Sequence, residues 1–153
     1  MRLGVLIHAE TVAPEAWAPL ARVLGDLGEV AVARAYADWS AAAVAPWFPV
    51  LRRHRIQLRH QFRTRSTQDP ALVAMAMDAP DFAAGCAADG VVLAGDVGSS
   101  MPVLLRLREQ GLAVVVAGPP STPLDIRDAC SDFVDLATLR TDGPDPGTGR
   151  HRA

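Results

Sequence analysis

Side chains that can carry chemistry follow directly after two short apolar segments of this sequence, Leu3 to Ile7 and Val91 to Ala94. They are His8, Glu10 and Thr11 after the first segment, and Asp96, Ser99 and Ser100 after the second. An imidazole beside carboxylates exchanges protons near neutral pH, and carboxylates also hold hard divalent cations. Hydroxyl groups at the start of a helix bind anions together with the backbone N–H groups.

Each of these side chains also has an ordinary structural interpretation. Asp96 suits a turn or a helix cap, His8 suits a hydrogen-bonded structural histidine, and the two serines suit a helix start. Ser99, His8 and Asp96 are the residue types of a hydrolytic triad, but no nucleophile-elbow pattern accompanies them, so we do not expect one. Asp96 is the one candidate metal ligand among them.

The elements that position these residues alternate between strand and helix patterns, which is typical of an α/β protein with a mainly parallel sheet. The expected strands are Leu3–Ile7, Val30–Ala35, Ile56–Phe62, Val91–Ala94 and Ala113–Ala117. The expected helices begin at Pro14, at Ser40 as N-cap, after Asp69 (residues 71 to about 84), at Pro102 and at Pro123. Carboxyl ends of parallel strands share one edge, so the two polar loops should border one crevice.

Composition limits the remaining choices. A chain of 153 residues with net charge −2 fits one domain, which we expect over residues 1–140, and lacks a strongly basic field. Residues 141–153 hold one apolar side chain, the terminal alanine, and are predicted to be a disordered tail. No apolar run reaches membrane-spanning length and no signal peptide pattern is visible, so a cytoplasmic location is expected. The composition predicts no oligomeric state.

One segment, residues 51–65, holds six of the fifteen arginines. Apolar and polar residues alternate within it, so its expected strand should have an apolar face and an arginine-bearing face. The candidate nucleic-acid-binding residues are Arg52, Arg53, Arg59, Arg63 and Arg65. A solvated edge strand, with charges that discourage pairing to other chains, explains the same pattern.

Five short motifs in order resemble the NYN domains, specifically their LabA-like branch, which belong to the PIN-like nuclease fold. The motifs are RAYADWS (34–40), MDAPDF (77–82), RLREQG (106–111), STP (121–123) and DACSDF (128–133). The likeness runs from about Leu3 to Leu136. It implies a single three-layer α/β/α, Rossmann-like domain with a mainly parallel sheet of five to six strands. It also implies an acidic crevice that holds Mg²⁺ or Mn²⁺ and hydrolyses RNA.

The acidic positions of that family pattern are mostly replaced here. His8 stands where the first acid is expected, Leu72 where the second is, and Val97 and Ser99 where the last two fall. A shift of one residue brings only Asp96 into place. A leucine or valine ligates no metal, so the resemblance implies a degenerate active site.

We therefore expect a binding or regulatory module for RNA or a protein partner, without a cofactor and without metal-dependent hydrolysis. RNA would be engaged through the segment from Arg52 to Arg65. One alternative is a ribonuclease whose Mg²⁺ or Mn²⁺ ligands are re-recruited from Glu10, Asp69, Asp96 and His8. A second is a repurposed enzyme that acts on a small molecule in the crevice around His8 and Asp96.

Overall fold

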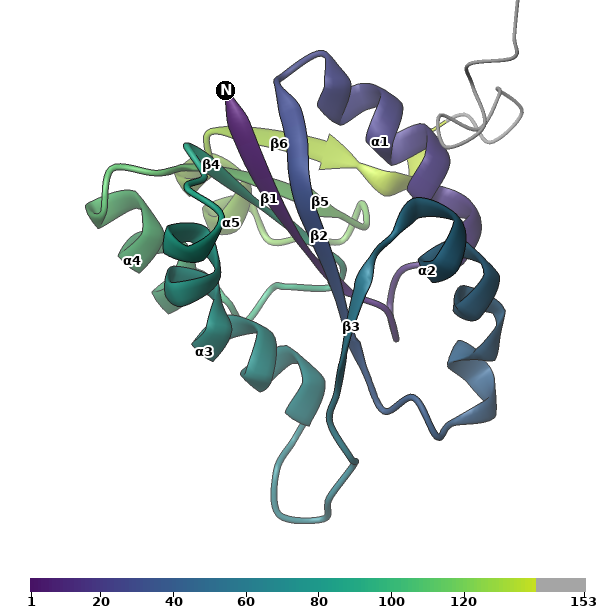
Figure 1. Cartoon of the computed structure of the whole chain (residues 1–153). Helices are drawn as coiled ribbons and strands as arrows, with labels where there is room; N and C mark the ends of the chain where they lie inside the picture. The colour runs from purple at the N-terminus through teal and green to yellow at the C-terminus, as the bar shows by residue number, and fades with distance from the viewer. Residues whose placement is uncertain (140–153) are drawn as a thin grey trace, which may run out of the picture.

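Six parallel strands form one sheet in the computed structural model, which describes residues 1–139 (Figure 1). The strands are β1 Arg2–His8, β2 Glu29–Ala37, β3 Gln57–His60, β4 Gly90–Ala94, β5 Ala113–Gly118 and β6 Asp132–Asp135. Their order is β3-β2-β1-β4-β5-β6, and all neighbours pair in parallel. The order reverses at β1, so the crevice of such a sheet is expected beside the carboxyl ends of β1 and β4.

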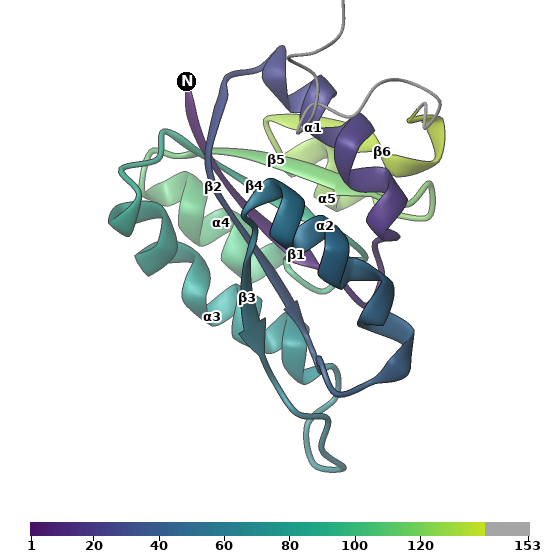
Figure 2. The ribbon, with the colours of Figure 1, turned by 45° about the vertical axis from the view of Figure 1, so that its right-hand side comes forward.

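Helices cover both faces of the sheet, which confirms the expected three-layer α/β/α architecture (Figure 2). The helices α1 Trp17–Gly25 and α2 Phe48–His54 lie on one face. The helices α3 Pro70–Gly85, α4 Met101–Glu109 and α5 Leu124–Ala129 lie on the other. Short 3-10 helices are η1 Pro14–Ala16, η2 Ala42–Trp47 and η3 Leu136–Thr138. None of the described helices is long and apolar enough to cross a bilayer.

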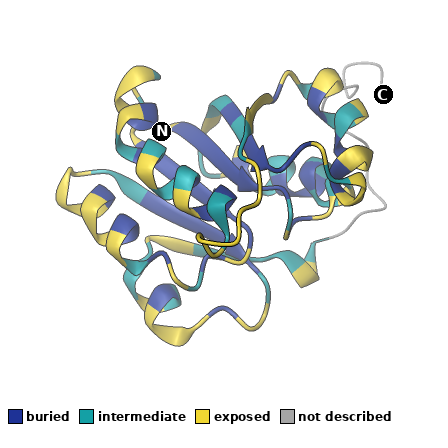
Figure 3. Cartoon of the chain, turned by 90° about the horizontal axis from the view of Figure 1, so that it is seen from below, coloured by how far each residue is buried: buried dark blue, intermediate teal, exposed yellow. Residues whose placement is uncertain are grey.

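The strands β1, β4 and β5 are almost completely buried between the two helical layers (Figure 3). Leu3, Val5 and Ile7 of β1 pack in the core beneath α1 and α2. Leu6 packs in the second core beneath α3 and α4. The central strands are therefore buried on both sides, as their continuous apolar runs predicted.

Two expected elements differ from the structure. Ser40 does not cap a helix, because its hydroxyl donates to Asp38, and η2 begins at Ala42 after the uncapped Ala41. The chain then continues past Pro46 as α2, since Pro49 lies in the first turn, where no N–H is needed. The strand β6 was not predicted, because this edge strand has only two apolar residues. The predicted tail, 141–153, lies outside the described residues.

The edge strand β3 is shorter than the expected span of residues 56–62, and its two faces are not covered as their residue types would indicate. Leu58 and Phe62, which lie on the expected apolar face, are 50% and 62% exposed. The polar face instead turns toward α3, where Arg59 lies 3.3 Å from Asp78. Because β3 pairs with a strand on one side only, the alternation of apolar and polar residues did not identify which face of the strand is covered.

A buried tyrosine joins β2 to α3 on the same side of the sheet. The Tyr36 hydroxyl donates to Asp78 at 2.7 Å, and Arg34 lies 3.8 Å from the same carboxylate. Burial, foremost, raises the pKa of Tyr36 to about 12. The neutral phenol is thus a structural donor that anchors the middle of α3.

Replacing Tyr36 with phenylalanine is expected to lower the free energy of unfolding by about 1–2 kcal/mol, because a buried bond to a carboxylate is lost. Urea denaturation measures the change. Since the folded-state pKa is raised, the wild-type chain should also lose stability as pH rises from 10 toward about 12. The phenylalanine variant should lack this tyrosine contribution. Equal alkaline profiles of the two proteins would contradict the assignment.

Candidate functional site

His8, the last residue of β1, is the centre of the polar cluster at the carboxyl edge of the sheet. Its side chain is 1% exposed. Nδ1 lies 2.7 Å from Thr11 Oγ1, and Nε2 lies 2.9 Å from Asp69 Oδ1. Asp69 is the N-cap of α3 and also accepts from the Leu72 N–H at 3.3 Å. The histidine therefore ties the start of α3 to the end of β1.

The contacts of His8 are complete in two protonation states. In the neutral ring, Nε2–H donates to Asp69 and the Thr11 hydroxyl donates to Nδ1. In the imidazolium, both ring nitrogens donate, and the Thr11 proton turns to the His8 carbonyl oxygen, 3.3 Å away. The threonine oxygen accepts the Asp96 N–H at 3.0 Å in either case.

Glu10 is held by donors of the chain itself. Its Oε2 accepts the Asp38 N–H at 2.9 Å, while Oε1 lies 3.4 Å from Arg63 and 3.9 Å from His8 Nε2. The glutamate side chain is 12% exposed. A carboxylate this deeply buried is tolerated because hydrogen bonds and basic groups surround it.

Asp38 fixes the adjoining loop. Hydrogen bonds from the Ser40 hydroxyl, foremost, and the Arg63 N–H hold the pKa of Asp38 below its ordinary value. Because the pKa of Asp38 is lower in the folded state than in the unfolded chain, its carboxylate stabilises the fold at pH values above the unfolded-state pKa. This stabilisation is lost as the pH falls through the folded-state pKa. Asp38 therefore holds the backbone of Arg63 beside the cluster.

Gly95 lets the loop after β4 approach the loop after β1. Its φ is +133°, and an added Cβ would lie 2.8 Å from both His8 Cβ and Thr11 Oγ1. Any side chain would therefore push the two loops apart. The next residue, Asp96, uses its N–H to reach Thr11.

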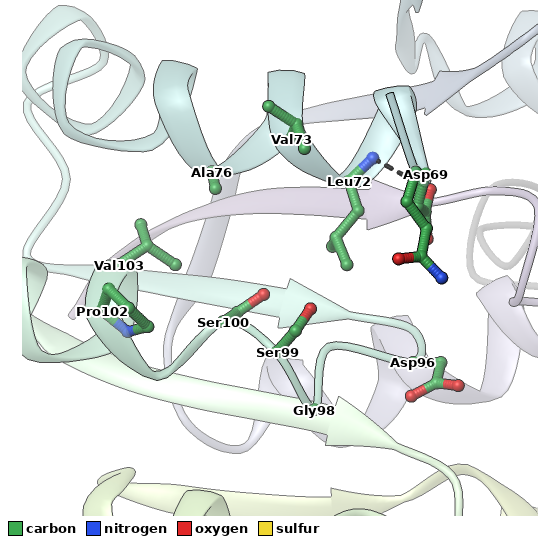
Figure 4. Close-up of a pocket in the computed structure, with 11 residues that line it drawn as sticks. Asp69, Leu72, Val73, Ala76, Asp96, Gly98, Ser99, Ser100, Pro102 and Val103 are labelled. Carbon is green, nitrogen blue, oxygen red and sulfur yellow. Dashed lines mark hydrogen bonds between the residues drawn. The ribbon is translucent and has the colours of Figure 1, made fainter. Parts of the chain in front are cut away.

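A cavity of about 530 Å³ lies between the starts of α3 and α4 (Figure 4). In Figure 4, Leu72 and Ala76 descend from α3, while Ser99 and Ser100 approach from the α4 side with their hydroxyls toward α3. Asp96 lies at the end near β4. The lining residues are Gln68, Asp69, Leu72, Val73, Ala76, Asp96, Gly98, Ser99, Ser100, Pro102 and Val103.

The NYN domain profile matches residues 2–137. The chain belongs to the NYN domain family. A crystal structure of a protein of unknown function from Vibrio parahaemolyticus is similar to this NYN domain at 20% identity, with a TM-score of 0.71. The match covers 88% of this chain and 91% of that chain, which supports the PIN-like fold. None of the curated proteins compared with this NYN domain gives a significant match.

Within this NYN domain, most of the positions expected to hold acidic residues hold non-acidic side chains. His8 is buried among hydrogen bonds, and Leu72 is a wall of the cavity. Val97 is 1% exposed and belongs to the apolar core, whereas Ser99 is exposed at the cavity. Asp96 is exposed and uses its backbone, rather than its carboxylate, to contact Thr11.

The fold does bring one set of metal-ligand types together. His8, Glu10 and Asp69 each offer one ligand atom, and these atoms lie within 4.8 Å of one another. An imidazole with two carboxylates suits a transition metal better than Mg²⁺. An ion there would have to displace the His8–Asp69 hydrogen bond. The Asp96 carboxylate is not a member of this set.

The five candidate arginines do not form one surface in this NYN domain. Arg52 and Arg53 lie in the last turn of α2, on one face of the sheet. Arg59 lies on the opposite face beside Asp78. Arg63 lines a cavity of about 370 Å³ together with His8, Glu10 and Asp69, and Arg65 is exposed in the following loop.

The predicted site residues His8, Glu10, Thr11 and Asp96 all lie at one edge of the sheet. Asp69 was expected only as a helix cap and a re-recruited ligand, yet this residue is the partner of His8. The Asp69-Pro70 pair, which marks the helix start, was the available signal. The part played by Asp38 was missed, although it lies in the RAYADWS motif.

Proposed function

We propose that this NYN domain binds RNA without hydrolysing it and without a metal ion. The observation that supports this function is the internal pairing of the two acids beside His8. Glu10 is bound by the Asp38 N–H and Arg63, and Asp69 by His8 and the Leu72 N–H. These carboxylates favour the protein's own donors over a hydrated cation.

RNA is the proposed partner because the family includes ribonucleases, which is an argument from analogy. The position of Arg63, which is exposed at the mouth of the crevice, adds a physical reason. Its guanidinium and that of Arg65 offer positive charge to a phosphate backbone that crosses this edge. We place the domain in the LabA-like branch on the strength of its RAYADWS motif.

A second candidate, a metal-dependent ribonuclease, is favoured by the approach of His8, Glu10 and Asp69 within 4.8 Å. In that case these three residues would hold a Mn²⁺-like ion, which would supply an activated water and neutralise phosphate charge. The two candidates differ in what manganese does to the protein.

Calorimetric titration of Mn²⁺ into the metal-stripped chain separates the two candidates. We expect no binding up to millimolar Mn²⁺ and no cleavage of a short single-stranded RNA in either Mn²⁺ or Mg²⁺. We also expect fluorescence anisotropy to give the same RNA affinity with EDTA as with Mn²⁺.

Micromolar Mn²⁺ binding that Asp69→Asn abolishes and Asp96→Asn retains would overturn the proposal in favour of the second candidate. Loss of binding in Asp96→Asn instead would also overturn it, but with the ion at the loop after β4. Absence of RNA binding in EDTA would refute the RNA-binding function directly.

A further inference from the structure

The cavity between α3 and α4 has two apolar walls that face each other. Leu72, Val73 and Ala76 come from α3, and Pro102 and Val103 come from α4. A volume of about 530 Å³ lies in the usual range of small-molecule sites. Two aliphatic walls suit the faces of a flat ring.

Ser100 gives an independent sign of a ligand. The residue is 6% exposed, and its hydroxyl makes neither a capping hydrogen bond nor any other bond to the described residues. Its hydroxyl is directed into the cavity (Figure 4). The hydroxyl is therefore accessible from the cavity and free to bond a polar atom of a bound molecule.

The charges at this cavity argue against an anion inside it. Asp69 and Asp96 line it, and no basic side chain does so among its lining residues. The start of α4 contributes roughly half a positive charge, which is less than the two carboxylates bring. The matching ligand is therefore uncharged and rich in hydrogen-bond donors.

We infer that this cavity binds the uncharged part of a nucleoside, its base and its sugar. The base lies between the apolar walls with an edge toward Ser100, and the sugar hydroxyls donate to Asp96, as ribose hydroxyls do to carboxylates after strands. The inference rests on the proposed function, since an unpaired nucleotide of a bound RNA would supply this base and sugar. Asp69 lines both this cavity and the one that contains Arg63, where phosphates would remain.

The four ribonucleosides, titrated separately into the isotopically labelled full chain in EDTA, are the probes. We expect at least one to bind in the sub-millimolar range and to shift the amide signals of Ser99, Ser100 and Val103. Ser100→Ala should weaken binding about five- to tenfold, the usual effect of one hydrogen bond. It should not lower the free energy of unfolding, because the hydroxyl has no partner in the free protein. A purely structural serine would lower it.

Ala76→Leu places a larger side chain inside the cavity and should abolish nucleoside binding. Ala84→Leu, a matched change on the exposed side of the same helix, should leave binding unchanged. If the Ala76 variant fails to fold, the Ser100→Ala comparison still decides the question.

Three results separate this inference from the proposed function. RNA binding that neither Ser100→Ala nor Ala76→Leu alters, with no nucleoside bound, would overturn the inference and leave the proposed function intact. Nucleoside binding without RNA binding would uphold the inference for free nucleosides and refute the proposed function. Inorganic phosphate that shifts the Ser99 and Ser100 amide signals and competes with the nucleoside would place an anion in this cavity and overturn the assignment of an uncharged ligand.

Discussion

Replacing Gly95 with alanine is expected to lower the free energy of unfolding by about 3 kcal/mol, the sum of backbone strain and overpacking. Gly95 has a φ of +133°, which residues with a Cβ atom rarely adopt. The new Cβ would also lie 2.8 Å from His8 Cβ and from Thr11 Oγ1. Both neighbours are held in place, because His8 is bound to Asp69 and Thr11 to the Asp96 N–H. The strain therefore cannot be relieved by moving one flexible side chain.

Urea denaturation of the variant measures this loss, and Gly85→Ala serves as the matched control. Gly85 is the last residue of α3, and a Cβ there would meet no atom within 4 Å. Its replacement should leave stability unchanged or raise it by up to about 1 kcal/mol. Similar effects of the two substitutions would show that the close approach of the β1 and β4 loops does not matter for stability.

Reversing the charge of Arg63 is expected to weaken RNA binding at least tenfold. The substitution Arg63→Glu removes a guanidinium at the mouth of the crevice and places a carboxylate beside Glu10, which Arg63 contacts at 3.4 Å. The repulsion opposes any phosphate that approaches this edge. Arg63 is 66% exposed, so the lost ion pair itself should cost the fold no more than about 1 kcal/mol. Because the new carboxylate also lies beside Glu10, which is 12% exposed, urea denaturation must first show that the variant is folded.

The control for this measurement is Arg52→Glu, which makes the same charge change on α2. We expect this variant to bind RNA with nearly the affinity of the wild-type chain, because α2 lies on the opposite face of the sheet from α3. Fluorescence anisotropy over a range of salt concentrations measures both variants. An equal loss for the two would indicate a nonspecific effect of net charge, and no loss for Arg63→Glu would exclude this edge as the RNA-binding surface.

Much of the fold was predictable because its signals are local. The apolar runs of β1, β4 and β5 are too short for helices and continuous because parallel strands are buried on both faces. The Asp69-Pro70 pair marked the start of α3 within one residue. The edge strands β3 and β6 were not predicted correctly, because each has one neighbouring strand and its burial depends on what packs beside it.

The sequence by itself determined that His8, Glu10, Thr11 and Asp96 meet at one edge, since the carboxyl ends of parallel strands share it. It also determined that Leu72 and Val97 ligate no metal, because a hydrocarbon side chain has no lone pair to offer. Only the tertiary structure decided that Asp69, sixty-one residues from His8, is the partner of that histidine. Only the structure, likewise, separated Arg52 from Arg63 and left the Ser100 hydroxyl facing a cavity. Contacts of this kind depend on strand order and on how helices pack, which local patterns of residue types do not specify.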